Sequence, residues 1–269
     1  MREAVQLIVR SGREPCTETV TAQFLRVKGC LCRDAAELAR QVDLLLVFGG
    51  DGTMLRVARE IAGSSTPILG INIGGLGFLT AVPSADLAQA LKRVWKGEFN
   101  FEPRALLRVA GRCGGRQVDR AALNDVVISR GNVSRMIELD VHVNGEPLTR
   151  YRCDGLIVSS ATGSTAYSLA AGGAVVFPTA PVLALTPICP HTLSNRALIL
   201  PLTANIEVKV ISPIPSTVLS ADGQSVCELQ PGEVVSIARS RRTVRLMHLA
   251  GSSFCQTLRL KLHWRGASL

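Results

Sequence analysis

Aromatic residues are scarce in this sequence, where Phe, Trp and Tyr together make up 4% of the chain. Because the hydrophobic content is nevertheless 47%, the interior must consist largely of Val, Leu, Ile and Ala, which favours sheets with aliphatic faces. With 19% charged residues the composition is that of a globular protein and excludes a disordered chain. A chain of 269 residues can form one large domain or two modest ones.

Closely spaced metal ligands are also missing. The four histidines show no ligand spacing, no CxxC pair occurs, and only Cys30 and Cys32 lie close together among eight cysteines. We therefore predict no structural metal site. Scattered cysteines in a chain of this length are expected to be small buried hydrophobic residues and not disulfide partners.

Export signals and membrane-spanning runs are not found. Residues 1–10 carry too much charge and too short an apolar run for a signal peptide. The most apolar later stretch, 175–189, is interrupted by Pro178, Pro181 and Pro187 and cannot be a spanning helix. These features predict a cytoplasmic protein with no membrane partner.

Acidic residues are absent after Glu233, and the whole chain carries a net charge of +9. A positive field attracts anionic partners such as nucleic acid, acidic lipid or nucleotides. A solvated basic surface or a subunit interface explains the same charge pattern about equally well.

The first hundred residues alternate strand and helix patterns. Strands are predicted at 5–9, 42–48 and 67–72, and helices at 18–27, 54–61 and 85–95. The run 42–48 is almost continuously apolar, which is typical of a parallel strand buried on both faces. Residues 1–102 are thus expected to form a Rossmann-like α/β domain with a doubly wound parallel sheet.

From about residue 103 short strand patterns alternate with turns such as Asn144-Gly145 and Asp222-Gly223. This spacing predicts an antiparallel β-sandwich over 103–248, with one helical insert at 164–171. The runs 234–238 and 244–249 read as separate strands. The segment 249–269, with a helix at 256–264, is expected to return to the first domain.

The strongest local motif is Gly49-Gly50-Asp51-Gly52-Thr53, which stands between a buried strand and a helix. Glycines let the backbone approach a ligand, and N–H groups at a helix start bind phosphate oxygens. Electrostatic repulsion disfavours a carboxylate beside bound phosphate. Asp51 is therefore interpreted as a group that accepts the proton of an attacking hydroxyl. The simpler interpretation is a tight turn with Thr53 capping the helix. Walker, protein-kinase and GxGxxG motifs do not occur.

Three further segments carry polar residues in loops. A second glycine cluster follows Asn72, which could hydrogen-bond a ligand, and Asn124-Asp125 suits an adenine edge and ribose hydroxyls. The glycine cluster is equally explained as a loop before a helix cap at Ser84, and an Asn-Asp pair alone is more often an ordinary turn. The stretch 154–173 runs from a strand into a Ser/Thr-rich turn that begins a short helix, with Tyr167 available to stack on a base.

Taken together and in order, these motifs resemble the ATP-NAD kinase family of bacterial type. The matching segments are GGDGT at 49–53, NIGGLGFLT at 72–80, the Asn-Asp pair at 124–125, DGL with TGSTAYS and AGG within 154–173, PHTLSNR at 190–196 and KLHW at 261–264. The resemblance covers about 42–265, and the joint occurrence is far more specific than GGDGT alone, which other kinases share.

The resemblance implies an N-terminal α/β domain and a C-terminal β-sandwich, with NAD bound in the crevice between the domains and phosphorylated on the 2′-hydroxyl of its adenosine ribose. Asp51 would be the catalytic carboxylate. The residues implied in binding substrate and nucleotide are Gly50, Gly52, Thr53, Asn72, Asn124, Asp125, Arg152, Asp154, Thr165, Ala166, Tyr167, Ala170, Asp222 and Gln224. The family also implies a divalent metal ion, Mg²⁺ by preference, bound with the phosphoryl donor, which is ATP, another triphosphate or polyphosphate. It further implies a homodimer or homotetramer.

Two departures from the family pattern bear on binding. Ala170 stands where serine is common, so one hydroxyl contact to NAD is expected to be missing. Arg152 is a basic residue at a position where enzymes strict for NAD carry one, which favours NAD over NADH.

Two other functions remain to be weighed. One is a kinase that shares GGDGT but acts on a sugar or lipid hydroxyl, against which the TGSTAYS segment argues. The other is a basic nucleic-acid-binding protein, which the scarcity of aromatics and the lack of a nucleic-acid module disfavour.

Overall fold

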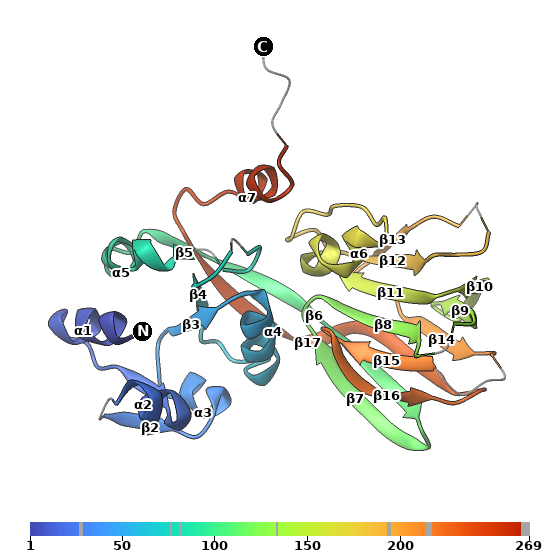
Figure 1. Ribbon diagram of the computed structural model, residues 1–269, viewed down its shortest axis with the longest axis horizontal. Coiled ribbons are helices and arrows are strands. Elements are labelled where there is room, and N and C mark those ends of the chain that lie inside the picture. Colours follow the sequence, from blue (N-terminus) through green and yellow to red (C-terminus); the bar gives the residue numbers. More distant parts are fainter. Residues whose placement is uncertain are drawn as a thin grey trace, which may run out of the picture. The chain divides into compact units, whose positions relative to one another are not determined.

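The computed structural model describes residues 1–26, 29–75, 77–80, 82–132, 134–192, 195–212 and 217–264 (Figure 1). The chain folds as two compact units, the first made of Met1–Pro103 and Thr243–Leu269 and the second of Arg104–Arg242. Two long strands, β6 (Phe99–Cys113) and β17 (Val234–Leu249), each begin in one unit and end in the other. The division expected from the sequence, at 102/103 and 248/249, stays a prediction.

The first unit is built on a parallel sheet. Strand β4 pairs in parallel with β3, with β5 and, through Leu246 and Ile68, with the end of β17. All five residues of β4 are buried, as its apolar sequence predicts for a central strand. The remaining bounds in this unit are α1 (Arg2–Arg10), β1 (Cys16–Glu18), α2 (Thr19–Leu25), β2 (Cys30–Cys32), α3 (Ala35–Ala39), β3 (Leu45–Gly49), α4 (Asp51–Glu60), β4 (Ile68–Asn72), β5 (Val82–Pro83), η1 (Ser84–Asp86), α5 (Leu87–Trp95) and α7 (Phe254–Lys261).

The strand predicted at 5–9 is wrong, because helix α1 occupies this segment. Ala4, Leu7 and Ile8 recur at helical spacing, and Ala4 is buried in the core cluster that also contains Leu87 and Leu91 of α5. A short apolar run does not distinguish a strand from a buried helical face. Packing against α5 selects the helix here.

The second unit is a β-sandwich, as expected. One sheet has the order β13-β12-β11-β8-β15-β16 (Figure 1). The other contains the run β10-β9-β14-β17, with β6 paired to β17 and β7 paired to β6, and β17 continues it to β4 of the first unit. A single aliphatic cluster includes residues of both sheets, and Tyr151 is the aromatic member among its described buried residues. The bounds are β7 (Arg116–Ala122), β8 (Asp125–Arg130), β9 (Ile137–Val143), β10 (Glu146–Cys153), β11 (Gly155–Ser160), η2 (Thr162–Thr165), α6 (Tyr167–Ala170), β12 (Val182–Ile188), β13 (Leu198–Pro201), β14 (Ile206–Val210), β15 (Thr217–Ala221) and β16 (Gln224–Leu229).

Two predicted elements differ in form. The runs 234–238 and 244–249 are one continuous strand, β17, because the arginine-rich stretch between them stays extended.

The apolar stretch 175–189 contains β12, and among the described residues no helix is long and apolar enough to cross a bilayer.

The expectation that the cysteines are unpaired is wrong for four of them. Disulfide bonds join Cys16 to Cys30 and Cys113 to Cys227. Their Cα–Cα separations of 4.6 and 6.2 Å lie in the range that a disulfide spans. These partners are brought together by tertiary structure, which spacing alone does not reveal. The free cysteines are Cys32 and Cys153, which are buried, and Cys189 and Cys255, which are exposed.

Candidate functional site

Two glycine-containing loops leave the same edge of the parallel sheet. Strand β3 ends at Gly49 and β4 at Asn72, and the strand register pairs these two residues. The carboxyl edge of a parallel sheet is where α/β proteins bind ligands. The structure therefore brings GGDGT together with the 72–80 loop, of which Leu76 lies outside the described residues.

Asp51 is the first residue of α4 and is fixed by the second loop. Its Oδ2 accepts a hydrogen bond from the Phe78 amide at 2.9 Å, and its Oδ1 accepts one from the Leu79 amide at 3.0 Å. The carboxylate is half-buried. Each carboxylate oxygen can accept a further hydrogen bond, so the two amides orient Asp51 and still leave it able to accept a proton or a hydrogen bond from a ligand. The sequence offered no signal for these two backbone donors.

The glycines of this edge serve two different purposes. A Cβ on Gly77 would overlap Asp51 Oδ1, and one on Gly49 would overlap the Thr53 side chain, so both positions are closely packed. By contrast, a Cβ on Gly50 or Gly52 would meet no heavy atom within 4 Å. Open space therefore lies beside the first turn of α4, where a helix has unpaired N–H donors suited to phosphate.

Asn72 is buried and holds its own loop together. Its Nδ2 donates to the Gly75 carbonyl at 2.7 Å and to Thr80 Oγ1 at 3.0 Å, while its Oδ1 accepts from the Gly74 amide at 2.8 Å. Both amide hydrogens are thus engaged within the loop. This arrangement favours a role in shaping the loop over a role as a direct donor to ligand.

The C-terminal helix adds a positive charge to this region. Lys261 of α7 places its ammonium 4.8 Å from the ring centre of Phe78, whose amide binds Asp51. Phe254 of the same helix contacts that ring at a centroid distance of 6.4 Å. The matched KLHW segment therefore reaches the loop that orients Asp51, and Lys261 was not identified as a site residue from the sequence.

In the second unit Asp222 holds the Asn124–Asp125 segment. It occupies the turn between β15 and β16 with φ +46°. Its Oδ1 accepts from the amides of Asn124 and Asp125 at 2.7 and 3.3 Å, and its Oδ2 accepts from Leu123 at 2.9 Å. Three donors from one segment converge on this carboxylate, which makes Asp222 a positioning residue in this unit.

The Ser/Thr-rich turn packs against the same segment. The Ser160 hydroxyl donates to the Leu123 carbonyl at 2.5 Å, and the Ser160 amide donates to the Asn124 carbonyl at 2.9 Å. A Cβ on Gly163 would overlap backbone atoms of Asn124, so only glycine allows this approach. Two motifs nearly forty residues apart thus form one surface.

Asp125 is a buried carboxyl group, 5% exposed. Burial, and secondarily the negative charge of Asp222, raises the pKa of Asp125 to about 7. Near neutral pH this group is therefore partly protonated, so it can both donate and accept hydrogen bonds. Such a raised value at a polar turn is typical of functional sites.

The raised pKa of Asp125 predicts a pH-dependent stability. Because the pKa in the folded protein lies above the ordinary value of 3.8, the folded state holds the proton more tightly, and stability falls as pH rises from about 4 to about 7. Asp125→Asn removes this loss, so the melting temperature of the variant relative to wild type should increase over that interval. The corresponding gain in the free energy of unfolding is on the order of a few kcal/mol at most. Thermal melts at several pH values measure it.

Asp119 offers a control of opposite sign. A hydrogen bond from Arg108 lowers the pKa of Asp119, and this pair is exposed. Because the folded pKa of Asp119 lies below the ordinary value of 3.8, Asp119→Asn should show a small effect of opposite pH trend that is confined to acidic pH, below about 5, and should be flat from there to pH 7. A flat difference between Asp125→Asn and wild type from pH 4 to 7 would contradict the raised pKa of Asp125.

The other predicted residues of this unit lie at two places. Thr165 and Ala166 are partly exposed at the end of η2, while Tyr167 and Ala170 on α6 and Gln224 on β16 are exposed. Tyr167 is 46% exposed, so it is not a core residue.

Arg152 lies on β10, one residue before its end, and Asp154 lies between β10 and β11, whereas Ser160 ends β11. Asp154 forms an ion pair with Arg130, in which Asp154 Oδ1 lies 2.9 Å from Arg130 Nε. The sequence gave no signal for this partner. Five residue steps along an extended strand separate Asp154 from Ser159, roughly 16 Å. Ser159 is the register partner of Asp125. The structure therefore does not bring Arg152 and Asp154 together with the Asn124–Asp125 segment.

Comparison with known proteins gives consistent matches. Residues 18–99 match the ATP-NAD kinase N-terminal domain and residues 123–249 the ATP-NAD kinase C-terminal domain. The chain is 40% identical to the NAD kinase of Cupriavidus pinatubonensis over 98% of this chain and 87% of that protein, and 39% identical to that of Geotalea daltonii over 97% and 92%.

Solved structures agree. Yeast NADH kinase in complex with NADH is similar with a TM-score of 0.89 and 27% identity, over 100% of this chain and 85% of that one. The NAD kinase of Archaeoglobus fulgidus in complex with ATP is similar with a TM-score of 0.70 and 28% identity, over 93% and 98%.

Proposed function

This chain belongs to the ATP-NAD kinase family, and on that premise we propose how its residues divide the work of phosphorylating NAD. The chain is an NAD kinase, a phosphotransferase that uses an alcohol group as acceptor. A GGDGT-type kinase acting on a sugar or lipid is not favoured, because the family matches extend through both units of the chain.

The observation that carries the mechanism is the fixed carboxylate of Asp51. Phosphoryl transfer depends mainly on positioning and charge neutralisation. Two backbone donors orient Asp51 at a helix start, beside open space above Gly50 and Gly52. Asp51 then takes the proton of the 2′-hydroxyl of the adenosine ribose as the hydroxyl attacks the donor phosphorus. The N–H group of Gly52, beside the open space at Gly50 and Gly52, binds a donor phosphate oxygen, whereas the Thr53 amide already donates to the Gly50 carbonyl at 3.1 Å.

A divalent ion fits this edge of the sheet. Mg²⁺ in such enzymes is held by one or two carboxylates together with substrate phosphates and water. Asp51 is a half-buried carboxylate with acceptor capacity left after its two amide contacts. Asp51 and the donor phosphates would hold Mg²⁺, which would neutralise phosphate charge. ATP is the donor that family membership favours, with other triphosphates and polyphosphate left to the assay.

The second unit supplies the surface for the adenosine. Asn124 and the partly protonated Asp125 offer donors and acceptors to the adenine edge and ribose, next to Thr165, Ala166 and Gln224. Asp222 acts through them by holding the backbone of the segment. Ala170, on the exposed face of α6, lacks the hydroxyl of the serine that is common at this position. NAD therefore forms one hydrogen bond fewer here than it would with serine.

Arg152 and Asp154 support a homo-oligomeric enzyme. Asp154, which directly precedes β11, lies roughly 16 Å from Ser159, the register partner of Asp125, and Arg152 lies two residues earlier on β10. One chain therefore does not offer both sets to one compact ligand. A neighbouring copy, in a homodimer or homotetramer, can contribute Arg152 and Asp154 to the nicotinamide half. The charge of Arg152 favours NAD over NADH. The cytoplasmic location and the lack of nucleic-acid and membrane partners stay predictions.

Tyr167 is proposed to stack on the adenine ring, since its side chain is exposed beside Thr165 and Ala166. Base stacking on an aromatic face is worth roughly 1–3 kcal/mol, so Tyr167→Ala should weaken NAD binding about tenfold or more. Tyr167→Phe keeps the ring and should lose much less. Calorimetric titration of both variants with NAD measures this, and unchanged affinity in Tyr167→Ala would rule out stacking.

The assignment is tested by incubating the purified protein with NAD, Mg²⁺ and, separately, ATP, another triphosphate or polyphosphate. Formation of NADP is expected with at least one donor. Parallel reactions with NADH, with a sugar and with a diacylglycerol as acceptor separate the possible substrates. Product only from the sugar or lipid would overturn the assignment.

A further inference from the structure

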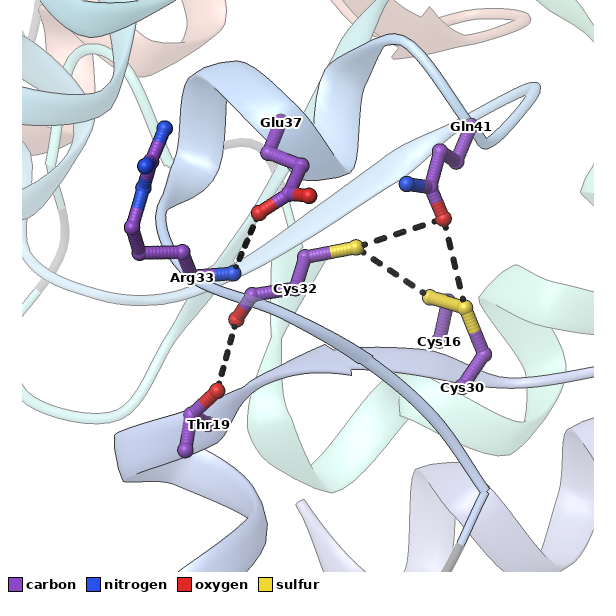
Figure 2. The surroundings of a disulfide bond; sticks show 7 residues. All are labelled: Cys16, Thr19, Cys30, Cys32, Arg33, Glu37 and Gln41. Atoms are coloured by element: carbon purple, nitrogen blue, oxygen red, sulfur yellow. Dashed lines mark hydrogen bonds between the residues drawn. A yellow bond between two sulfur atoms is a disulfide. The ribbon is translucent and has the colours of Figure 1, made fainter.

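Three cysteine sulfurs gather at one edge of the first unit (Figure 2). Strands β1 and β2 pair in parallel with Cys16 opposite Cys30, and Cys32 lies two residues further along β2 on the same face. The Sγ atoms of Cys16, Cys30 and Cys32 all lie within 4.8 Å of one another, and that of Cys32 is 3.6 Å from that of Cys16. We name these three residues the cysteine cluster.

The three cysteines of the cluster differ in solvent exposure. Cys30 is exposed, Cys16 is half-buried and Cys32 is 1% exposed. Gln41, just beyond α3, places its Oε1 3.5 Å from the sulfurs of both Cys30 and Cys32. The cluster therefore offers three sulfur atoms and one amide oxygen close together, with one of the sulfur-bearing residues exposed to solvent.

Cys32 is the buried member of the cluster, and its sulfur lies next to the Cys16–Cys30 pair. A bound metal ion deprotonates a coordinating thiol outright, so a buried cysteine can serve as a thiolate ligand once the ion is present.

We propose that the cysteine cluster, when Cys16 and Cys30 are reduced, is a binding site for one thiophilic metal ion such as Zn²⁺. Three thiolates around zinc, each about 2.3 Å from the ion in tetrahedral geometry, lie about 3.8 Å apart. The 3.6 Å separation of Cys32 and Cys16 is already close to that value. Soft thiolate ligands select zinc and copper(I) over magnesium and calcium.

The chemistry balances with a named reductant. A dithiol or phosphine gives two electrons to the Cys16–Cys30 bond, which breaks to two thiols. One M²⁺ ion then replaces the three thiol protons, which leave to solvent, and the resulting site carries one negative charge. Oxidation of the cluster to the disulfide removes two of the three ligands.

The test uses the full chain reduced with a phosphine under anaerobic conditions, freed of reductant and titrated with Co²⁺. We expect one Co²⁺ per chain with sulfur-to-cobalt charge-transfer absorption, which one equivalent of Zn²⁺ abolishes. Cys30→Ser is a suitable ligand variant because its exposed position leaves the fold intact. Its Co²⁺ affinity should fall by more than about 100-fold, beyond the loss typical of a residue outside the ligand set.

Matched controls use cysteines outside the cluster. The double variant Cys189→Ser/Cys255→Ser removes exposed free thiols, and Cys227→Ser removes a thiol released from the second disulfide. Both should bind Co²⁺ as wild type does. Failure of the reduced wild-type chain to give the charge-transfer band, or full binding by a Cys30→Ser protein with wild-type circular dichroism, would overturn the proposal.

Discussion

Asparagine in place of Asp51 is expected to lower kcat by about 10²-fold or more, the scale for a positioned general base. The side chains are nearly isosteric, but asparagine cannot take a proton from the ribose hydroxyl. Steady-state kinetics with NAD and ATP measure the loss. A folded Asp51→Asn protein with wild-type kcat would falsify the role of Asp51.

The structure shows a second consequence of this substitution that must be separated from the first. Both Asp51 oxygens accept backbone amides, and asparagine would set an NH₂ group against the Phe78 or Leu79 donor. Gly77→Ala is the matched control, because its Cβ would overlap Asp51 Oδ1 and disturb the loop while keeping the carboxylate. If loop geometry alone matters, both variants should lose activity alike. If Asp51 is the base, Gly77→Ala should keep much more activity than Asp51→Asn, because it retains the carboxylate.

The second large effect is expected at Asp222. Asp222→Ala removes the acceptor of three amides at Leu123, Asn124 and Asp125. An unpaired buried donor costs about 1–3 kcal/mol, so stability should fall by about 2–4 kcal/mol, allowing for partial relaxation. Because Asn124 and Asp125 lose their position, NAD affinity should fall about tenfold or more. Denaturant unfolding and calorimetric titration measure the two quantities.

Asp222→Asn separates the two causes of the Asp125 pKa shift. Asparagine keeps one oxygen to accept amide hydrogens and removes the negative charge, so most of the stability should return. The pKa of Asp125 should then fall only part of the way to its ordinary value, because burial is the larger cause of the shift. An NAD affinity equal to wild type in Asp222→Ala would show that the Asn124–Asp125 segment does not bind the adenosine.

Much of the fold could be predicted from local pattern. The predicted strand at 67–72 contains β4, the predicted helix at 85–95 contains α5, and the buried run 42–48 before GGDGT overlaps β3. These elements were predictable because burial on one or both faces imposes a hydrophobic period on the sequence. The helix α1 was missed because its apolar run is short enough to fit either period, and only contact with α5 decides between them.

The cysteines show a different limit. Cys16 and Cys30 are fourteen residues apart, and Cys113 and Cys227 are more than a hundred apart. Spacing along the chain carries little information about which sulfurs meet. Parallel pairing of β1 with β2 brings the first pair together, and that pairing depends on the segment with helix α2 that connects the two strands.

For the candidate site, the sequence by itself determined the chemistry of the parts: a carboxylate among glycines at a helix start, an Asn-Asp pair, and a Ser/Thr-rich turn with an exposed tyrosine. Only the tertiary structure decided the hydrogen-bond partners, the burial and the protonation of these groups. It placed the Phe78 and Leu79 amides on Asp51, set Asp222 on the 123–125 backbone, and buried Asp125 enough to raise its pKa to about 7. Hydrogen-bond direction and desolvation depend on distances between atoms that are far apart in the chain, and no local pattern encodes those distances.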